Sequence, residues 1–148
     1  EYAQLNTREK NVVFNNNCYF DPAKDSYNQY YNAFVAYVDS KTMDIVTMET
    51  EDLRALGEKG RLMDLSNKEI AGSLAEKYAD RLIYATPKDK EYSTQPIPIG
   101  IDLSDTCLVT EFGLYTQSCA LGVSSLAPHL DKIELFLEYV LSWEEANE

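Results

Sequence analysis

Hydrophobic positions along the chain switch repeatedly between the spacing of a helix and the short runs typical of buried strands. A β-prone run at residues 12–14 is followed by three asparagines and then by a helical period over residues 25–38. There the aromatic and apolar side chains recur every three or four positions, which places them on one helix face. Residues 43–48 are mostly apolar and partly β-branched, as expected of a buried parallel strand. The pattern predicts a strand, a helix and a strand in this order.

Two more helices are expected in the middle of the chain. The first begins near Thr50 and ends near Gly60, because glycine is common at the position just after a helix. The second begins at the capping-box pattern of residues 66–69 and continues to Tyr78. Residues 82–85 are short and apolar, which indicates another strand.

The last third of the chain predicts two strands and the clearest helix. Residues 95–103 contain two prolines, which favour an edge strand or an extended crossing segment over a central strand. Residues 104–118 have no readable period, residues 120–123 indicate a buried strand, and a helix begins near Pro128. Strands that alternate with helices imply crossover connections. We therefore predict an α/β fold with a mainly parallel or mixed sheet flanked by helices.

Length and composition are typical of one domain. The chain has 148 residues, of which 45% are hydrophobic, so a core forms without metal or disulfide support. Eleven tyrosines, five phenylalanines and one tryptophan exclude a disordered chain. Residues 1–10 are polar and lack periodicity, which predicts a flexible lead-in before a single domain over residues 11–148.

The strong negative charge narrows the choice of partners. The chain has 25 acidic and 13 basic residues, a formal net charge of −12. Such a surface repels phosphate backbones and anionic lipids, so we expect no nucleic-acid partner. A cationic ligand, a divalent cation or a basic protein is compatible with it, although acidity is also explained by solubility alone. No run of eighteen apolar residues occurs, which predicts no transmembrane segment in this chain.

Cysteine usage leaves the compartment open. Cys18, Cys107 and Cys119 form no C-x-x-C pair, which argues against a zinc or thioredoxin-type site. Three buried thiols, or one disulfide in an exported protein, are both compatible with their spacing. The chain begins with Glu1 rather than Met, so we expect that a targeting or anchoring segment has been removed.

The candidate catalytic residues have simpler explanations. The chain has one histidine, His129, which follows Ser124 and Ser125 and precedes Asp131. A Ser-His-Asp triad needs side chains that converge from separate elements, whereas these residues crowd the start of one helix. Helix capping and the helix dipole explain them better. Nucleotide-binding loops are absent and residues 102–105 match a calcium loop only loosely, so we predict no enzyme, cofactor or metal.

Polar residues that follow the predicted strands are the candidate ligand-binding positions. In open α/β sheets, ligands bind outside the carboxyl ends of the strands. Capping of the following helices explains the same acidic residues equally well. The candidates are Asn15, Asn16, Asn17, Glu49, Thr50, Asp102 and Ser104.

Several stretches together resemble the bacterial extracellular solute-binding proteins of the two-lobed periplasmic-binding type. Residues 60–65 are similar to the family's "g-x-l-x-dL" passage, and residues 96–102 look like its segment crossing between lobes. The other matching stretches are residues 44–48, 51–53, 121–125 and 136–141. Members of that family need more than twice this length to build two lobes. The resemblance therefore implies a domain like one lobe of that fold.

The resemblance implies a binding function rather than catalysis. We expect a non-enzymatic, solute-binding-like domain that takes a small polar or cationic solute. Its expected location is extracellular or at the surface of a bacterial cell, with a lipoprotein or other membrane anchor at a preceding N-terminal segment. The alternative is an acidic protein-interaction or structural module without a small-molecule ligand. Ligand identity, oligomeric state and the disulfide state of the cysteines stay open.

Overall fold

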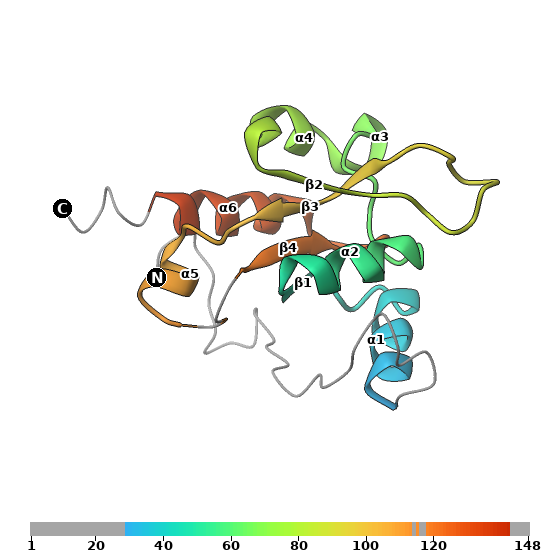
Figure 1. Ribbon diagram of the computed structural model, residues 1–148, viewed down its shortest axis with the longest axis horizontal. Coiled ribbons are helices and arrows are strands. Elements are labelled where there is room, and N and C mark those ends of the chain that lie inside the picture. The colour runs from blue at the N-terminus through green and yellow to red at the C-terminus, as the bar shows by residue number, and fades with distance from the viewer. Residues whose placement is uncertain (1–28, 114, 116–117, 143–148) are drawn as a thin grey trace.

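The computed structural model describes residues 29–113, 115 and 118–142 (Figure 1). The predicted lead-in at residues 1–10, the predicted strand at residues 12–14 and the candidates Asn15, Asn16 and Asn17 lie outside these residues. The described helices are α1 (Gln29–Asp39), α2 (Thr50–Glu58), α3 (Lys68–Ala71), α4 (Leu74–Lys77), the short 3₁₀ helix η2 (Ala79–Arg81), α5 (Cys107–Thr110) and α6 (Leu130–Leu141). The described strands are β1 (Ile45–Met48), β2 (Leu82–Ala85), β3 (Ile97–Asp102) and β4 (Ala120–Val123).

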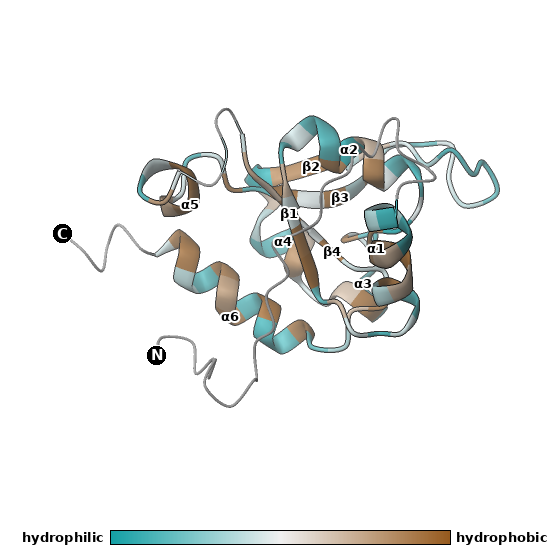
Figure 2. Ribbon diagram, turned by 90° about the horizontal axis from the view of Figure 1, so that it is seen from below, coloured by the Kyte–Doolittle hydropathy of each residue, from teal (hydrophilic) through white to brown (hydrophobic). Residues whose placement is uncertain are grey.

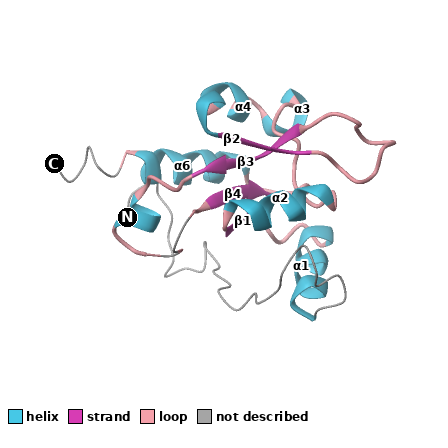
Figure 3. Ribbon diagram, viewed as in Figure 1, coloured by secondary structure: helices cyan, strands magenta, loops and turns pink. Residues whose placement is uncertain are grey.

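The four strands form one sheet in the order β1-β4-β3-β2, and every neighbouring pair is antiparallel (Figure 3). The predicted α/β fold with a mainly parallel or mixed sheet is therefore wrong. β1 and β3 do run in the same direction, but β4 inserts between them and runs opposite to both. β2 and β3 are joined by a loop without a helix, so they pair as a hairpin rather than through a crossover.

β3 is a central strand despite its proline, which corrects the prediction of an edge strand. Only residues 100–102 pair with β4, so Pro98 lies in the part of β3 that extends beyond it. The carbonyl oxygen of Pro98 accepts a hydrogen bond from the backbone N–H of Leu65 at 2.9 Å. The pairing with β2 also shifts register between Ile83 and Tyr84, beside the proline. Proline is tolerated because no regular ladder bond from its nitrogen is required at this irregular position.

Helices cover both faces of the sheet, and Figure 2 shows α2 and α6 on opposite sides of the strands. One apolar cluster joins α1 and α2 to the sheet through Phe34, Val38, Leu53, Leu56, Leu62, Ile83, Ala85, Ile99 and Ala120. The other cluster joins α3, α4 and α6 to the opposite face, with Ile101, Leu121 and Val123 at its centre. The core is thus divided into two apolar layers by one antiparallel sheet.

Glycines allow α2 to pack unusually close to the sheet. Gly100 and Gly122 are direct neighbours in β3 and β4. A Cβ atom on Gly100 would collide with Leu53, and one on Gly122 would lie 2.9 Å from Leu53 Cδ1. On the helix itself, a Cβ on Gly57 would lie 2.9 Å from Ile99 Cγ1. The side chain of Leu53 therefore occupies a hollow that exists only because both sheet positions are glycine.

The helix predicted over residues 66–78 is broken in two. Gly72 has φ +59°, which separates α3 from α4, and Asn67 rather than Ser66 caps α3 by accepting from the backbone N–H of Glu69. Gly60 has φ +81° just after α2, as predicted for the end of that helix. None of the described helices combines the length and hydrophobicity needed to cross a bilayer.

Candidate functional site

Four of the predicted site residues meet at one end of the sheet. Met48 and Asp102 both pair with Ala120, so the carboxyl ends of β1 and β3 lie on either side of the start of β4. Glu49 and Thr50 follow β1, and Asp102 and Ser104 mark the end of β3. They were predicted as strand-end positions of a mainly parallel or mixed sheet, and in the antiparallel sheet they lie at one end because β1 and β3 run in the same direction on either side of β4.

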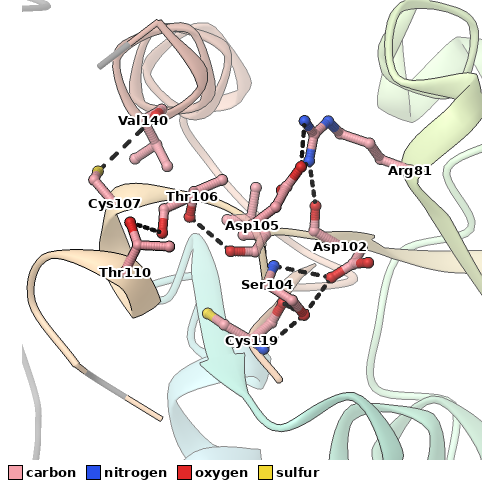
Figure 4. A network of polar contacts seen from close by, with 10 residues as sticks. Arg81, Asp102, Ser104, Asp105, Thr106, Cys107, Thr110, Cys119 and Val140 are labelled. Carbon is pink, nitrogen blue, oxygen red and sulfur yellow. Dashed lines mark hydrogen bonds and ion pairs between the residues drawn. The ribbon is translucent and has the colours of Figure 1, made fainter. Parts of the chain in front are cut away.

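Polar groups at the end of β3 are hydrogen-bonded to one another and to the residue before β4 (Figure 4). The Ser104 hydroxyl donates to Asp102 Oδ1 at 2.6 Å and accepts from the backbone N–H of Cys119 at 3.1 Å. The backbone N–H of Ser104 also donates to Asp102 Oδ1, at 2.9 Å. The N–H of Thr50 donates to Ser118 Oγ at 3.0 Å. The bonds of Ser104 join the end of β3 to the start of β4, and the bond of Thr50 joins the start of α2 to the segment before β4. Ligand binding by these residues stays a prediction.

Charge and burial shape the same end of the sheet. Arg81 Nη1 donates to Asp105 Oδ1 at 2.7 Å and to the carbonyl oxygen of Asp102 at 3.2 Å. The hydrogen bond from Arg81 lowers the pKa of the Asp105 carboxyl below its ordinary value. Burial, with a smaller effect from the charge of Asp102, raises the pKa of the Cys119 thiol to about 11. No pattern around Arg81 in the sequence indicated this role.

His129 contacts Asp44, a residue that the sequence did not indicate as its partner. Its Nδ1 lies 3.0 Å from Asp44 Oδ2, and its backbone N–H donates to Asp44 Oδ1 at 2.9 Å. Within the described residues the imidazole makes no hydrogen bond with Ser124, Ser125 or Asp131. The Ser124 hydroxyl is buried and has no hydrogen-bond partner in that part of the chain. Asp44 therefore ties the start of α6 to the start of β1.

A groove of about 550 Å³ lies at the opposite end of the sheet. It is formed by the end of α2, residues 60–64, Ile70 of α3 and the loop between β2 and β3, which Figure 1 shows extending away from the sheet. Hydrogen bonds hold its walls. The backbone N–H of Lys88 donates to the carbonyl oxygen of Glu58 at 2.9 Å, and that of Met63 donates to Val123 at 2.8 Å.

The three basic side chains that line this groove all contact other groups of the chain. Two of these contacts are ion pairs with carboxylates, which offset the positive charge that a ligand would meet. The three contacts are Lys88 Nζ with Glu58 Oε2 at 3.9 Å, Arg61 Nη1 with Asp39 Oδ1 at 3.0 Å, and Lys59 Nζ above the Tyr31 ring at 4.6 Å from its centroid.

Two acidic side chains of the lining, Asp64 and Asp89, accept hydrogen bonds from their own turns but form no ion pair with a described residue. Asp64 Oδ1 accepts from the backbone N–H and the hydroxyl of Ser66, and Asp89 Oδ1 accepts from the backbone N–H of Glu91. Neither carboxylate is in an ion pair with any residue that the structure describes. No cationic side chain of the described residues therefore offsets either carboxylate.

Tyr92 is the aromatic side chain of this site. It is 60% exposed, and its backbone N–H donates to the carbonyl oxygen of Asp89, so the two residues share one turn. Partial burial, and then the negative charge of Asp64, raise the pKa of the Tyr92 phenol above its ordinary value. The phenol therefore lies within the electrostatic reach of Asp64, and its residue belongs to the same turn as Asp89.

The sequence did not indicate this groove, because residues 86–94 are mostly polar and have no periodic pattern. A tyrosine inside an otherwise polar loop was the available signal. Among the described residues no group of three or more His, Cys, Asp or Glu side chains is placed to hold a metal ion. Comparisons with protein-family models, curated proteins and solved structures found no match, so function has to be inferred from geometry and charge.

Proposed function

We propose that this chain is a non-enzymatic solute-binding domain and that the groove beside Tyr92 is its binding site. The observation that carries the proposal is the groove itself. Its volume of about 550 Å³ lies within the range of roughly 300 to 1,000 Å³ typical of small-molecule sites. Its walls combine six apolar or aromatic side chains with six charged ones, so the groove offers both kinds of contact to a polar solute.

The arrangement of the candidate catalytic groups supports binding rather than chemistry. The His129 imidazole contacts Asp44, and the Ser124 hydroxyl is buried without a hydrogen bond to it among the described residues. The Cys119 thiol is buried, and its raised pKa keeps it protonated at neutral pH, so it is a poor nucleophile. The location that we propose, outside a bacterial cell and anchored to its surface, rests on the family resemblance.

The alternative of an interaction module that pairs through a sheet edge is less well supported. The Tyr115 hydroxyl donates to the carbonyl oxygen of Thr47 in the edge strand β1 at 2.8 Å. Arg54 Nε donates to the carbonyl oxygen of Tyr84 in the other edge strand, β2, at 3.2 Å. Both side chains occupy backbone acceptors that an added strand needs.

A thermal-shift screen against sugars, amino acids, short peptides and organic amines tests the proposed function. A ligand at about a hundred times its dissociation constant adds roughly 2.7 kcal/mol of stability, which moves the unfolding midpoint by several degrees. We expect one chemical class to produce a dose-dependent shift.

Two tryptophan variants locate the binding site. Ile70 lines the groove and is 46% exposed, so Ile70→Trp fills the groove without disturbing the core, and we expect it to abolish the shift. Leu126 is 42% exposed and lies outside the groove lining, so Leu126→Trp is the matched control and keeps the shift. A shift that Ile70→Trp leaves intact, or no shift from any class, contradicts the proposal.

A further inference from the structure

We infer that the ligand of the groove is a small organic ammonium ion, held between the Tyr92 ring and the carboxylates of Asp64 and Asp89. This inference rests on the proposed function and adds the chemical class of the ligand to it. It follows from two carboxylates that have no cationic partner among the described residues, from the tyrosine in the groove lining, and from the lack of a metal-binding set in that part of the chain.

The balance of unpaired charge in the groove is negative. Acidic and basic residues are equal in number in the lining, three of each. The basic side chains contact Glu58, Asp39 and the Tyr31 ring, whereas Asp64 and Asp89 have no cationic partner among the described residues. A cation therefore finds two free carboxylates there, while an anion would have to displace existing contacts. The net charge of −12 adds long-range attraction for cations.

The tyrosine indicates an organic cation rather than an inorganic one. A cation above an exposed aromatic face gains roughly 0.5–1 kcal/mol, and organic ammonium groups also gain from contact of their carbon atoms with the ring. Calcium needs six to eight oxygen ligands, and one oxygen of each carboxylate is already used by the local turn. The described residues hold no acidic cluster large enough for a metal ion.

The first test compares choline with its neutral isostere 3,3-dimethylbutan-1-ol, and adds putrescine as a primary amine. All three are titrated into the wild-type chain, and binding is followed by calorimetry and by amide NMR shifts. We expect choline or putrescine to bind about tenfold or more tightly than the neutral alcohol, because the alcohol keeps the shape of choline but lacks the charge.

Variants then separate charge from structure. Asp64→Asn and Asp89→Asn keep the Oδ1 acceptor of each turn and remove only the charge, and each is expected to weaken binding about threefold to fivefold. Tyr92→Leu removes the ring and weakens binding about fivefold, whereas Tyr92→Phe keeps affinity within about twofold. Asp80→Asn is the matched control, because Asp80 is an exposed residue of η2 outside the groove lining, and its variant binds like wild type.

The outcomes distinguish this inference from the proposed function. If neither ammonium ion binds, or the neutral alcohol binds equally well, the assignment of ligand class is wrong. If a sugar or another neutral class then binds and is blocked by Ile70→Trp, the groove is still a solute site. If ammonium ions bind but Asp80→Asn weakens them as much as Asp64→Asn does, binding is nonspecific attraction to an acidic protein and the inference fails.

Discussion

Ser104 connects the Asp102 carboxylate to the backbone of Cys119, at the end of the sheet where the sequence predicted ligand binding. Its hydroxyl accepts from the N–H of Cys119 and donates to Asp102, so its polar capacity is used within the chain. The same is true of the N–H of Thr50, which is satisfied by Ser118. We interpret this end of the sheet as a stabilising junction between β3 and β4.

Ser104→Ala leaves the backbone N–H of Cys119 without its acceptor. Loss of the acceptor for a partly buried donor costs about 1–3 kcal/mol, which urea unfolding measures. Affinity at the groove should not change. The control is Ser40→Ala, whose hydroxyl bonds are exposed and whose loss has little effect on stability. Unchanged stability together with lost ligand affinity would instead make Ser104 a binding residue.

Cys119 is expected to be unreactive in the folded protein. Its pKa is raised from 9.0 to about 11, so its thiolate is scarcer in the folded state than in the unfolded state at any pH below that range. The stability linked to this group is complete below pH 9 and is lost as the pH rises toward 11.

Iodoacetamide at pH 8, followed by mass spectrometry of the peptide that contains Cys119, checks this expectation. Labelling should be slow in buffer and fast in urea, because unfolding exposes the thiol and restores its ordinary pKa. Rapid labelling in buffer, while the protein keeps its thermal unfolding midpoint and is therefore folded, would contradict the burial of this residue.

At the scale of elements, close packing of α2 depends on the paired glycines beneath Leu53. Gly122→Ala places a Cβ 2.9 Å from Leu53 Cδ1 and about as close to Leu62, so overpacking should cost about 1–3 kcal/mol. The collision should be relieved when Leu53 is shortened. We expect the cost of Gly122→Ala to be smaller in a Leu53→Ala background, as a double-mutant cycle of unfolding free energies shows. Additive effects would mean that the glycine is needed for another reason.

The sequence predicted individual elements better than their partners. The strands at residues 45–48, 82–85 and 120–123 and the last helix lie close to where their apolar periods placed them. The direction of neighbouring strands was wrong, because it depends on β4 inserting between β1 and β3 from far along the chain. The prolines also misled the prediction for β3. Pro98 lies beyond the part of β3 that pairs with β4 and beside a register shift in the pairing with β2, so its missing N–H breaks no regular ladder bond.

At the scale of the whole molecule, the two ends of the sheet have different roles. Glu49, Thr50, Asp102 and Ser104 were chosen because they follow predicted strands, and they lie at one end of the sheet because β1 and β3 run in the same direction. The groove could not be predicted in the same way. It forms where the loop after β2 meets the end of α2, and that contact depends on the tertiary hydrogen bond between Lys88 and Glu58.

An amide NMR titration of the whole chain with choline tests the central claim most directly. The account predicts saturable shifts at residues 57–64 and at Lys88, Asp89 and Tyr92, which line the groove, with little change at the junction between β3 and β4. Shifts centred on Thr50, Asp102 and Ser104 would place the site at the opposite end of the sheet. The absence of saturable shifts with choline and with the ligand classes of the thermal screen would contradict a solute-binding function.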